Sequence, residues 1–153
     1  MRIFLLLLAI LMPTTVMAAN SVALQSAVYV EKMVTDAKGR SKAILQEPNI
    51  VVPGDRLIFV VSYQNTGAAP ASNFVVTNPL PSAVSYQGTS DPMAQVSING
   101  GHDWDRLNQL KVKESDGNWR AARPEDVTHI RWAMKQAVPV GGIGKLSFRG
   151  VVR

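Results

Sequence analysis

The stretch that decides the fold is residues 56–64, which read RLIFVVSYQ. One set of alternate positions is wholly apolar, whereas the other set ends in Ser62 and Gln64. A period of two, filled with β-branched and aromatic residues, is typical of a strand that buries one face. A turn precedes it at residues 53–55, Pro-Gly-Asp, because proline fixes φ and glycine tolerates positive φ. Another turn follows at residues 65–67, Asn-Thr-Gly, so the stretch predicts a buried β-strand between two turns.

Working outward, the same alternation recurs at short spacing along the chain. We expect further strands at residues 22–34, 42–45, 73–77, 84–87, 95–98, 128–134 and 145–152. Helical periodicity is nearly absent, and only Trp104 to Leu110 has apolar spacing suited to one or two turns. Short strands with frequent turns predict an all-β, immunoglobulin-like β-sandwich of about seven to eight strands. The Cys–Trp–Cys pattern of antibody domains is missing, so this likeness is architectural.

The first residues predict export. Arg2 precedes an apolar run at residues 3–12, and small or apolar residues follow at 16–18. This is the layout of a secretory signal peptide, and the run is shorter than the ~20 apolar residues of a membrane-spanning helix. We expect residues 1–18 to be a signal peptide cleaved after Ala18, with cleavage after Ala19 as the second choice. The alternative is an uncleaved membrane anchor.

The length of the remaining chain, residues 19–153, suits one domain. The whole chain has 153 residues and a formal net charge of +5, with both signs interspersed, so neither a basic arm nor an acidic tail is present. There is no cysteine, which excludes disulfides, a lipid anchor on cysteine and thiolate metal sites. No second apolar stretch is long enough to cross a membrane. We therefore expect an exported domain that is soluble or peripherally bound and relies on a hydrophobic core.

Three segments together resemble a known family. They are VPGDRL at residues 52–57, the Asn65-Thr66-Gly67 turn and VVTNPLP at residues 75–81. Their order and spacing resemble the bacterial "conserved repeat domain", a domain of unknown function (number eleven), over about residues 50–87. The resemblance implies an extracytoplasmic immunoglobulin-like fold, roles in adhesion or scaffolding at the envelope, and no catalytic residues. Two features depart from the family pattern: Asn78 replaces the usual aspartate, and the motif occurs once rather than in tandem, which argues against a stalk.

Residues suited to catalysis or metal binding are few. The only histidines are His102 and His129, and no nucleophile-elbow motif accompanies them. Asp103 and Asp105 offer oxygen ligands in one loop, but Ca²⁺ needs six to eight, and the neighbouring sequence supplies few more. The sequence therefore predicts no enzyme, no cofactor and no metal site.

A basic stripe is expected if strands 128–135 and 145–153 pair antiparallel. Its solvent-facing residues are His129, Arg131, Lys135, Lys145, Arg149 and Arg153. Such a stripe attracts anionic polymers or headgroups, and we take Arg131, Lys145, Arg149 and Arg153 as the candidate contacts for an anionic partner. The alternative is a solvated face that protects a sheet edge. No nucleic-acid partner is expected, because Trp104, Trp119 and Trp132 are not interleaved with these basic residues.

Two functions remain open. The leading hypothesis is an exported structural or interaction module of the bacterial envelope or cell surface, with another envelope or surface protein as its partner. Strand addition at a free sheet edge is one route to such binding. The alternative is a secreted or periplasmic binding module for an anionic polymer or glycan. The location is periplasmic, cell-surface or secreted in either case.

Overall fold

The computed structural model describes residues 22–153. The expected signal peptide and its cleavage site lie outside these residues. Within them, no helix is long and apolar enough to cross a membrane.

The described chain is all-β, with antiparallel strands and two single turns of 3₁₀ helix. The strands are β1 (Val22–Thr35), β2 (Ser41–Gln46), β3 (Arg56–Asn65), β4 (Val75–Pro79), β5 (Val84–Gly88), β6 (Ala94–Ser97), β7 (Lys111–Lys113), β8 (Trp119–Ala121), β9 (His129–Ala133) and β10 (Ile143–Val152). The turns are η1 (Leu107–Gln109) and η2 (Pro124–Asp126). Every strand expected from the alternation is present. The sequence reasoning missed β7 and β8, because three residues are too few to show a period.

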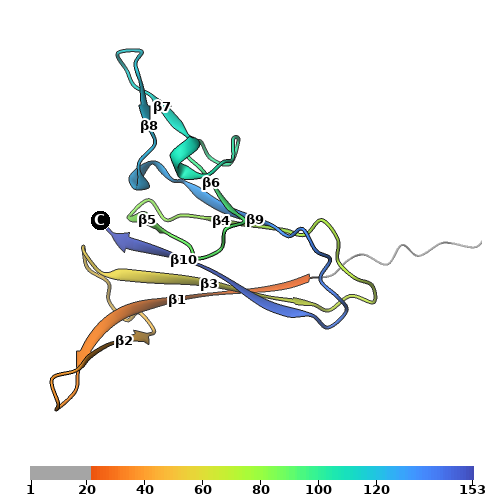
Figure 1. The fold of residues 1–153 in the computed structure, drawn as a ribbon, viewed down its shortest axis with the longest axis horizontal. Coiled ribbons are helices and arrows are strands. Elements are labelled where there is room, and N and C mark those ends of the chain that lie inside the picture. The colour runs from red at the N-terminus through yellow and green to blue at the C-terminus, as the bar shows by residue number, and fades with distance from the viewer. Residues whose placement is uncertain (1–21) are drawn as a thin grey trace, which may run out of the picture.

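The strands form two larger sheets and one small hairpin (Figure 1). The order is β2-β1-β3-β10-β5 in the five-stranded sheet and β4-β9-β6 in the three-stranded sheet, while β7 pairs only with β8. The Pro53-Gly54-Asp55 turn ties β3 to the last strand, since the Gly54 amide donates to the Val152 carbonyl and the Val152 amide donates to the Asp55 carbonyl. Gly54 has φ of +94°, which explains the glycine at this position.

One hydrophobic core joins the two larger sheets. Phe148 of β10 stacks on Phe59 of β3 at a centroid distance of 4.5 Å, within the five-stranded sheet. It also lies 6.1 Å from Trp132 of β9, in the three-stranded sheet. Trp132 and Ile130 are fully buried, with 0% exposure. Alternate positions of β3, β9 and β10 therefore supply the centre of the core.

The last two strands do not pair with each other, so the condition for the basic stripe is not met. β9 pairs with β4 and β6, whereas β10 pairs with β3 and β5. The connection between them crosses from one sheet to the other: Val138 pairs with Ala71, and the Gly142 carbonyl accepts from the Asn65 amide. These contacts hold the connection away from a hairpin path, so the predicted basic stripe is divided between two sheets.

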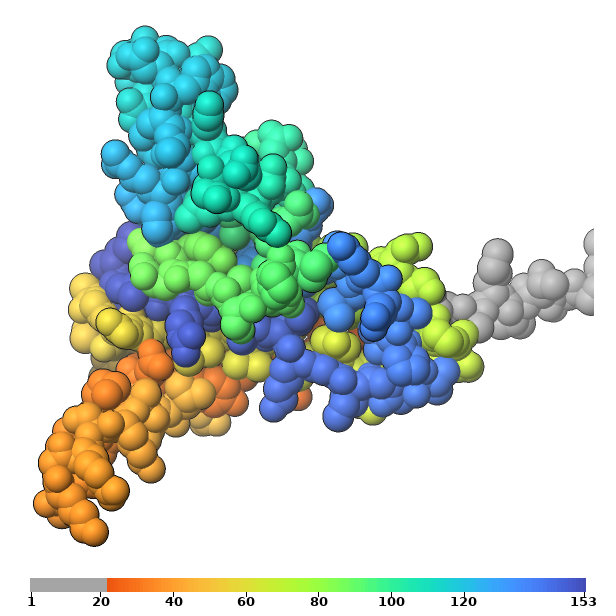
Figure 2. All heavy atoms as spheres, in the orientation of Figure 1, coloured from red at the N-terminus to blue at the C-terminus, as the bar shows by residue number. Residues whose placement is uncertain are grey.

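Two hairpins project from the body on opposite sides (Figures 1 and 2). One is the β1–β2 arm, residues 32–45. It arises because β3 pairs with β1 only from Val22 to Glu31, so the rest of β1 pairs with β2 alone. Its apolar side chains are uncovered, with Met33 68% and Leu45 51% exposed. The other projection is the β7–β8 hairpin.

The base of the β7–β8 hairpin is held by an ion pair that makes it sensitive to acid. Arg120 Nη1 and Nη2 donate to the two Asp126 carboxylate oxygens at 2.6 and 2.8 Å. The hydrogen bond from Arg120 lowers the pKa of Asp126 below its ordinary value of 3.8, and the Arg123 amide adds to this effect. A carboxyl whose folded pKa is lowered stabilises the folded state above its unfolded pKa and loses that contribution as pH falls through the folded pKa.

We therefore expect Asp126→Asn to speed hydrogen exchange in β8 (Trp119–Ala121) at pH 7. The difference from the wild type should shrink as the solution is acidified and vanish below the lowered pKa of Asp126, where the wild-type carboxyl is also neutral. Exchange measured by mass spectrometry at both pH values tests this. Equal exchange in the two proteins at pH 7 would show that the ion pair does not hold the hairpin. Glu125→Gln, which removes a charge at the exposed neighbouring position, serves as the control.

Candidate interaction site

One long edge of the five-stranded sheet is open. β2 pairs with β1 only from Val30 to Thr35, so no strand of residues 22–153 lies beside the same side of residues 22–29. Among the described residues, the backbone of 22–29 pairs only with β3. This eight-residue segment, which we name the β1 edge, ends where Gln46 of β2 stands opposite Val30.

The direction of the unpaired backbone groups follows from Asn65. Its amide donates to Gly142 and its carbonyl accepts from Gly141, both on the β10 side of β3. The N–H and C=O groups of successive residues alternate in direction along a strand, so the even-numbered residues of β3 turn their N–H and C=O groups to β1. In the register of the two strands, these even-numbered residues lie opposite odd-numbered residues of β1. The open side of the β1 edge therefore presents the N–H and C=O groups of Val22, Leu24, Ser26 and Val28.

The β1 edge carries none of the usual protection against strand pairing. Its sequence, VALQSAVY, has no charge, proline or glycine over eight residues. Soluble proteins commonly blunt such edges with lysine, proline, bulges or short strands. Other edges here follow that rule: β2 carries Lys42, β4 ends at Pro79, and β6 (Ala94–Ser97) is short. The β1 edge is therefore the segment best prepared for pairing with another strand.

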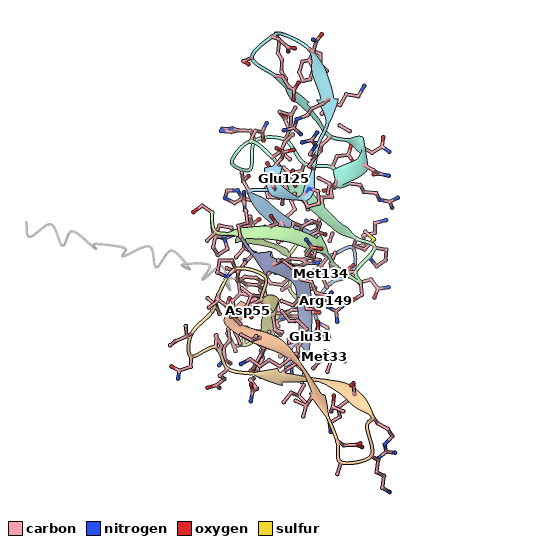
Figure 3. All side chains as sticks on the ribbon, turned by 90° about the vertical axis from the view of Figure 1, so that its left-hand side faces the viewer. Glu31, Met33, Asp55, Glu125, Met134 and Arg149 are labelled. Carbon is pink, nitrogen blue, oxygen red and sulfur yellow. The ribbon has the colours of Figure 1, made fainter. Side chains whose placement is uncertain are left out.

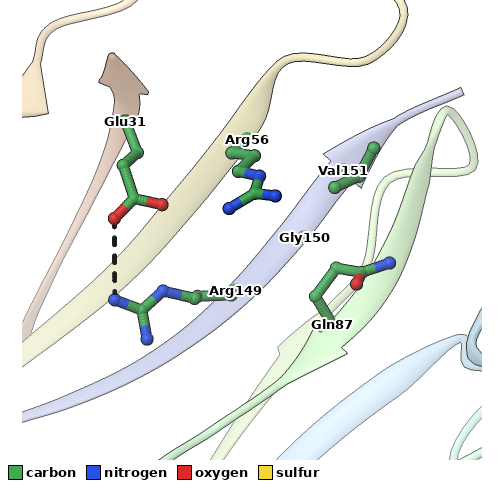
Figure 4. Close-up of a pocket in the computed structure, with 6 residues that line it drawn as sticks. All are labelled: Glu31, Arg56, Gln87, Arg149, Gly150 and Val151. Carbon is green, nitrogen blue, oxygen red and sulfur yellow. Dashed lines mark ion pairs between the residues drawn. The ribbon is translucent and has the colours of Figure 1, made fainter. Parts of the chain in front are cut away.

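A polar hollow lies on the outer face of the same sheet, the face turned away from the core. Its volume is about 460 Å³, and its lining residues are Glu31, Arg56, Gln87, Arg149, Gly150 and Val151 (Figure 4). An Arg149 Nη atom lies 3.8 Å from a Glu31 carboxylate oxygen, a long ion pair with Arg149 60% exposed. Arg56 forms no ion pair with the described residues. Two guanidinium groups against one carboxylate leave a local excess of positive charge. Figure 3 shows Glu31 and Arg149 near the base of the arm, with Met33 farther out.

The four predicted anion contacts do not form one patch. Lys145 and Arg149 share the outer face of the five-stranded sheet, since both lie opposite even-numbered residues of β3. Arg131 belongs to the other sheet, where it donates to Gln95 Oε1 and lies 4.6 Å over the Trp104 ring. Arg153 follows β10 and donates to the Val84 carbonyl at 3.2 Å. The sequence reasoning missed Arg56, although the alternation in residues 56–64 places it on the solvent side.

Two other polar residues singled out by sequence, His129 and Asp103, have local partners. His129 Nδ1 lies 3.0 Å from Thr128 Oγ1, and Asp103 accepts from the Asn99 side chain. Among residues 22–153, no group of three or more histidines, aspartates or glutamates is placed to hold a metal ion.

The two tryptophans outside the core differ. Trp104 is half-buried, donates from Nε1 to the Gly101 carbonyl and packs edge-on against His129. Trp119 is 64% exposed on the β7–β8 hairpin. Trp104 thus contacts its own fold, whereas Trp119 leaves a large aromatic surface uncovered. The chain matches no protein-family model, and it is similar to no curated protein and no solved structure.

Proposed function

We propose that this chain is an exported, non-catalytic interaction module of the bacterial envelope or cell surface, with an immunoglobulin-like sandwich that binds another protein by strand addition. The observation that carries the proposal is the β1 edge, residues 22–29, which is open and unprotected. Strand addition gains affinity from main-chain hydrogen bonds and specificity from alternate side chains. The signal-peptide pattern and the resemblance to the conserved repeat domain support the location and the fold class.

The shape of the molecule supports binding rather than catalysis. The β1–β2 arm and the β7–β8 hairpin extend away from the body and carry exposed apolar side chains at their surfaces, such as Met33, Leu45 and Trp119. Aromatic and long apolar residues are common anchors in protein interfaces. The polar hollow, in contrast, is lined by one carboxylate and two guanidinium groups, without the paired acid and base that catalysis uses.

A site-directed cross-link tests the proposed function. The chain has no cysteine, so Ser26→Cys introduces a single thiol on the β1 edge for a photoactivatable label. Ser90→Cys, in the exposed loop after β5, is the matched control. We expect light to join Ser26→Cys, but not Ser90→Cys, to one reproducible protein in the native envelope, and to do so at high salt. Equal labelling from both positions, or none from Ser26→Cys, would contradict strand addition at this edge.

A second candidate function is binding of an anionic glycan in the polar hollow. The specific observation in its favour is that Arg56 and Arg149 line one hollow with Glu31 as its single carboxylate. Exposed charge contacts weaken with salt, because the screening length falls to about 3 Å at 1 M. This salt dependence separates the second candidate from strand addition, which depends on backbone hydrogen bonds.

We expect the double change Arg56→Gln and Arg149→Gln to weaken binding to polygalacturonate at least about ten-fold in low salt, since each lost charge contact is worth on the order of 1 kcal/mol. The control is Arg40→Gln at the exposed tip of the arm. It removes one positive charge but leaves the residues that line the hollow unchanged. Calorimetry at low and high salt measures both. Unchanged affinity in the double variant would remove the glycan hypothesis.

A further inference from the structure

We propose that the strand that pairs with the β1 edge is the same edge of a second copy, which forms an antiparallel two-fold dimer. This inference rests on the proposed function, because it names the partner strand. Two copies of the edge are complementary, both in their side chains and in their backbone hydrogen-bonding groups.

The unpaired backbone groups match when two copies are aligned about Gln25. In that register Val22 lies opposite Val28 of the second copy, and Leu24 lies opposite Ser26. These are the residues whose N–H and C=O groups point to the open side, so each one gains a partner that also points outward. A shift by two residues in one direction brings Val22 opposite Val30, whose outward groups already pair with β2. The end of β2 therefore limits the register, and the central alignment satisfies the whole edge.

The side chains tolerate this self-pairing. On the outer face, Ala23 lies opposite Ala27 of the second copy, and Gln25 lies opposite its own counterpart across the two-fold axis. On the core face, Leu24 is 53% exposed in the single chain and gains apolar cover from the added strand. Like charges directly opposite each other destabilise strand pairs, and the edge has no charge to oppose. Nothing in the edge thus discriminates against a second copy.

The resulting dimer is closed and isologous, because a two-fold axis normal to the sheet uses the same patch on both copies. The two five-stranded sheets become one continuous sheet with its outer faces on one side. The two arms then extend from opposite ends of this surface. The polar hollow, lined by Arg56 and Arg149, is repeated on the same face of the dimer.

Sedimentation velocity of the exported protein, expressed from its full sequence, tests the inference. We expect a dimer at concentrations on the order of 100 μM. Gln25→Lys places two positive charges across the two-fold axis and should weaken association at least about five-fold. The matched control is Gln64→Lys, on the neighbouring strand β3 and equally on the exposed outer face, which should associate as the wild type does.

A mixture provides the sharper measurement. Gln25→Glu alone should be as weak as Gln25→Lys, whereas the two variants mixed should form a heterodimer, because opposite charges then face each other. A wild type that stays monomeric at this concentration, or a Gln25→Lys variant that associates as the wild type does, would overturn the dimer. A monomer that still cross-links through Ser26→Cys to a different envelope protein would overturn the dimer but leave the proposed function standing.

Discussion

Replacing Trp132 by alanine is expected to lower the free energy of unfolding by about 3–5 kcal/mol, the usual range for removing a buried aromatic side chain. Trp132 has 0% exposure and joins the two sheets by its contact with Phe148 at 6.1 Å. The three-stranded sheet has no larger side chain to fill the space, and the surrounding strands cannot collapse fully. Urea unfolding followed by circular dichroism measures the loss.

Two further variants separate packing from other effects. Trp119→Ala removes the same side chain where it is 64% exposed, and we expect a change within about 0.5 kcal/mol. Trp132→Phe keeps a ring in the core and removes the indole Nε1, which is buried without a hydrogen-bond partner among the described residues. A buried donor without a partner destabilises the fold, and Trp132→Phe removes that donor. Trp132→Phe should therefore be more stable than its loss of side-chain volume alone would predict, and clearly more stable than Trp132→Ala. A small effect of Trp132→Ala would mean that the two sheets do not share one cooperative core.

Asn65→Asp is expected to destabilise the fold by about 3–5 kcal/mol at pH 7, through an unpaired buried charge. Asn65 is fully buried at 0% exposure, and its Nδ2 donates to the Ala69 and Val138 carbonyls, both at 2.9 Å. Its Oδ1 accepts from the Gly67 amide. An ionised aspartate keeps the oxygen that accepts from Gly67 but replaces Nδ2 with a second negatively charged oxygen. That oxygen faces the two carbonyl oxygens and is buried away from water.

The pH dependence gives this prediction its sign. Burial against two carbonyls raises the pKa of the introduced carboxyl above its unfolded value of about 3.9, so the folded state binds a proton that the unfolded state has lost. The stability deficit should therefore be smallest below about pH 4 and grow as pH rises towards 7. Asn49→Asp makes the same chemical change at an exposed loop position and should show neither effect. A deficit independent of pH would indicate a loss of shape rather than a buried charge.

At the Asn-x-Gly turn, the local sequence predicted the backbone conformation but not the long-range contacts. The sequence indicated a turn at residues 65–67, and the structure places one there. It also shows a role that no local pattern reveals, because Asn65 holds a segment 73 residues away through the Val138 carbonyl. That contact guides the connection before β10 back to the five-stranded sheet. For this reason β9 and β10 do not pair, and the basic stripe that required their pairing does not form.

The candidate site divides in the same way. The alternation predicted β1 and its returning strand β2 from residues 22–34 and 42–45. It did not predict that β2 covers only the far half of β1, which leaves residues 22–29 open. Likewise, the solvent-facing position of Arg56 follows from its place in β3, but its proximity to Arg149 follows from the pairing of β3 with β10.

The sequence by itself determined eight of the ten strands, the apolar face of the central strand β3, and that no disulfide contributes to this chain. These properties follow from residue type and a period of two, so they are local. Only the tertiary structure decided which strands are neighbours, where an edge stays open, and which basic residues share a face. These properties depend on contacts between segments far apart in the chain, such as Asn65 with Val138, and a local period carries no information about them.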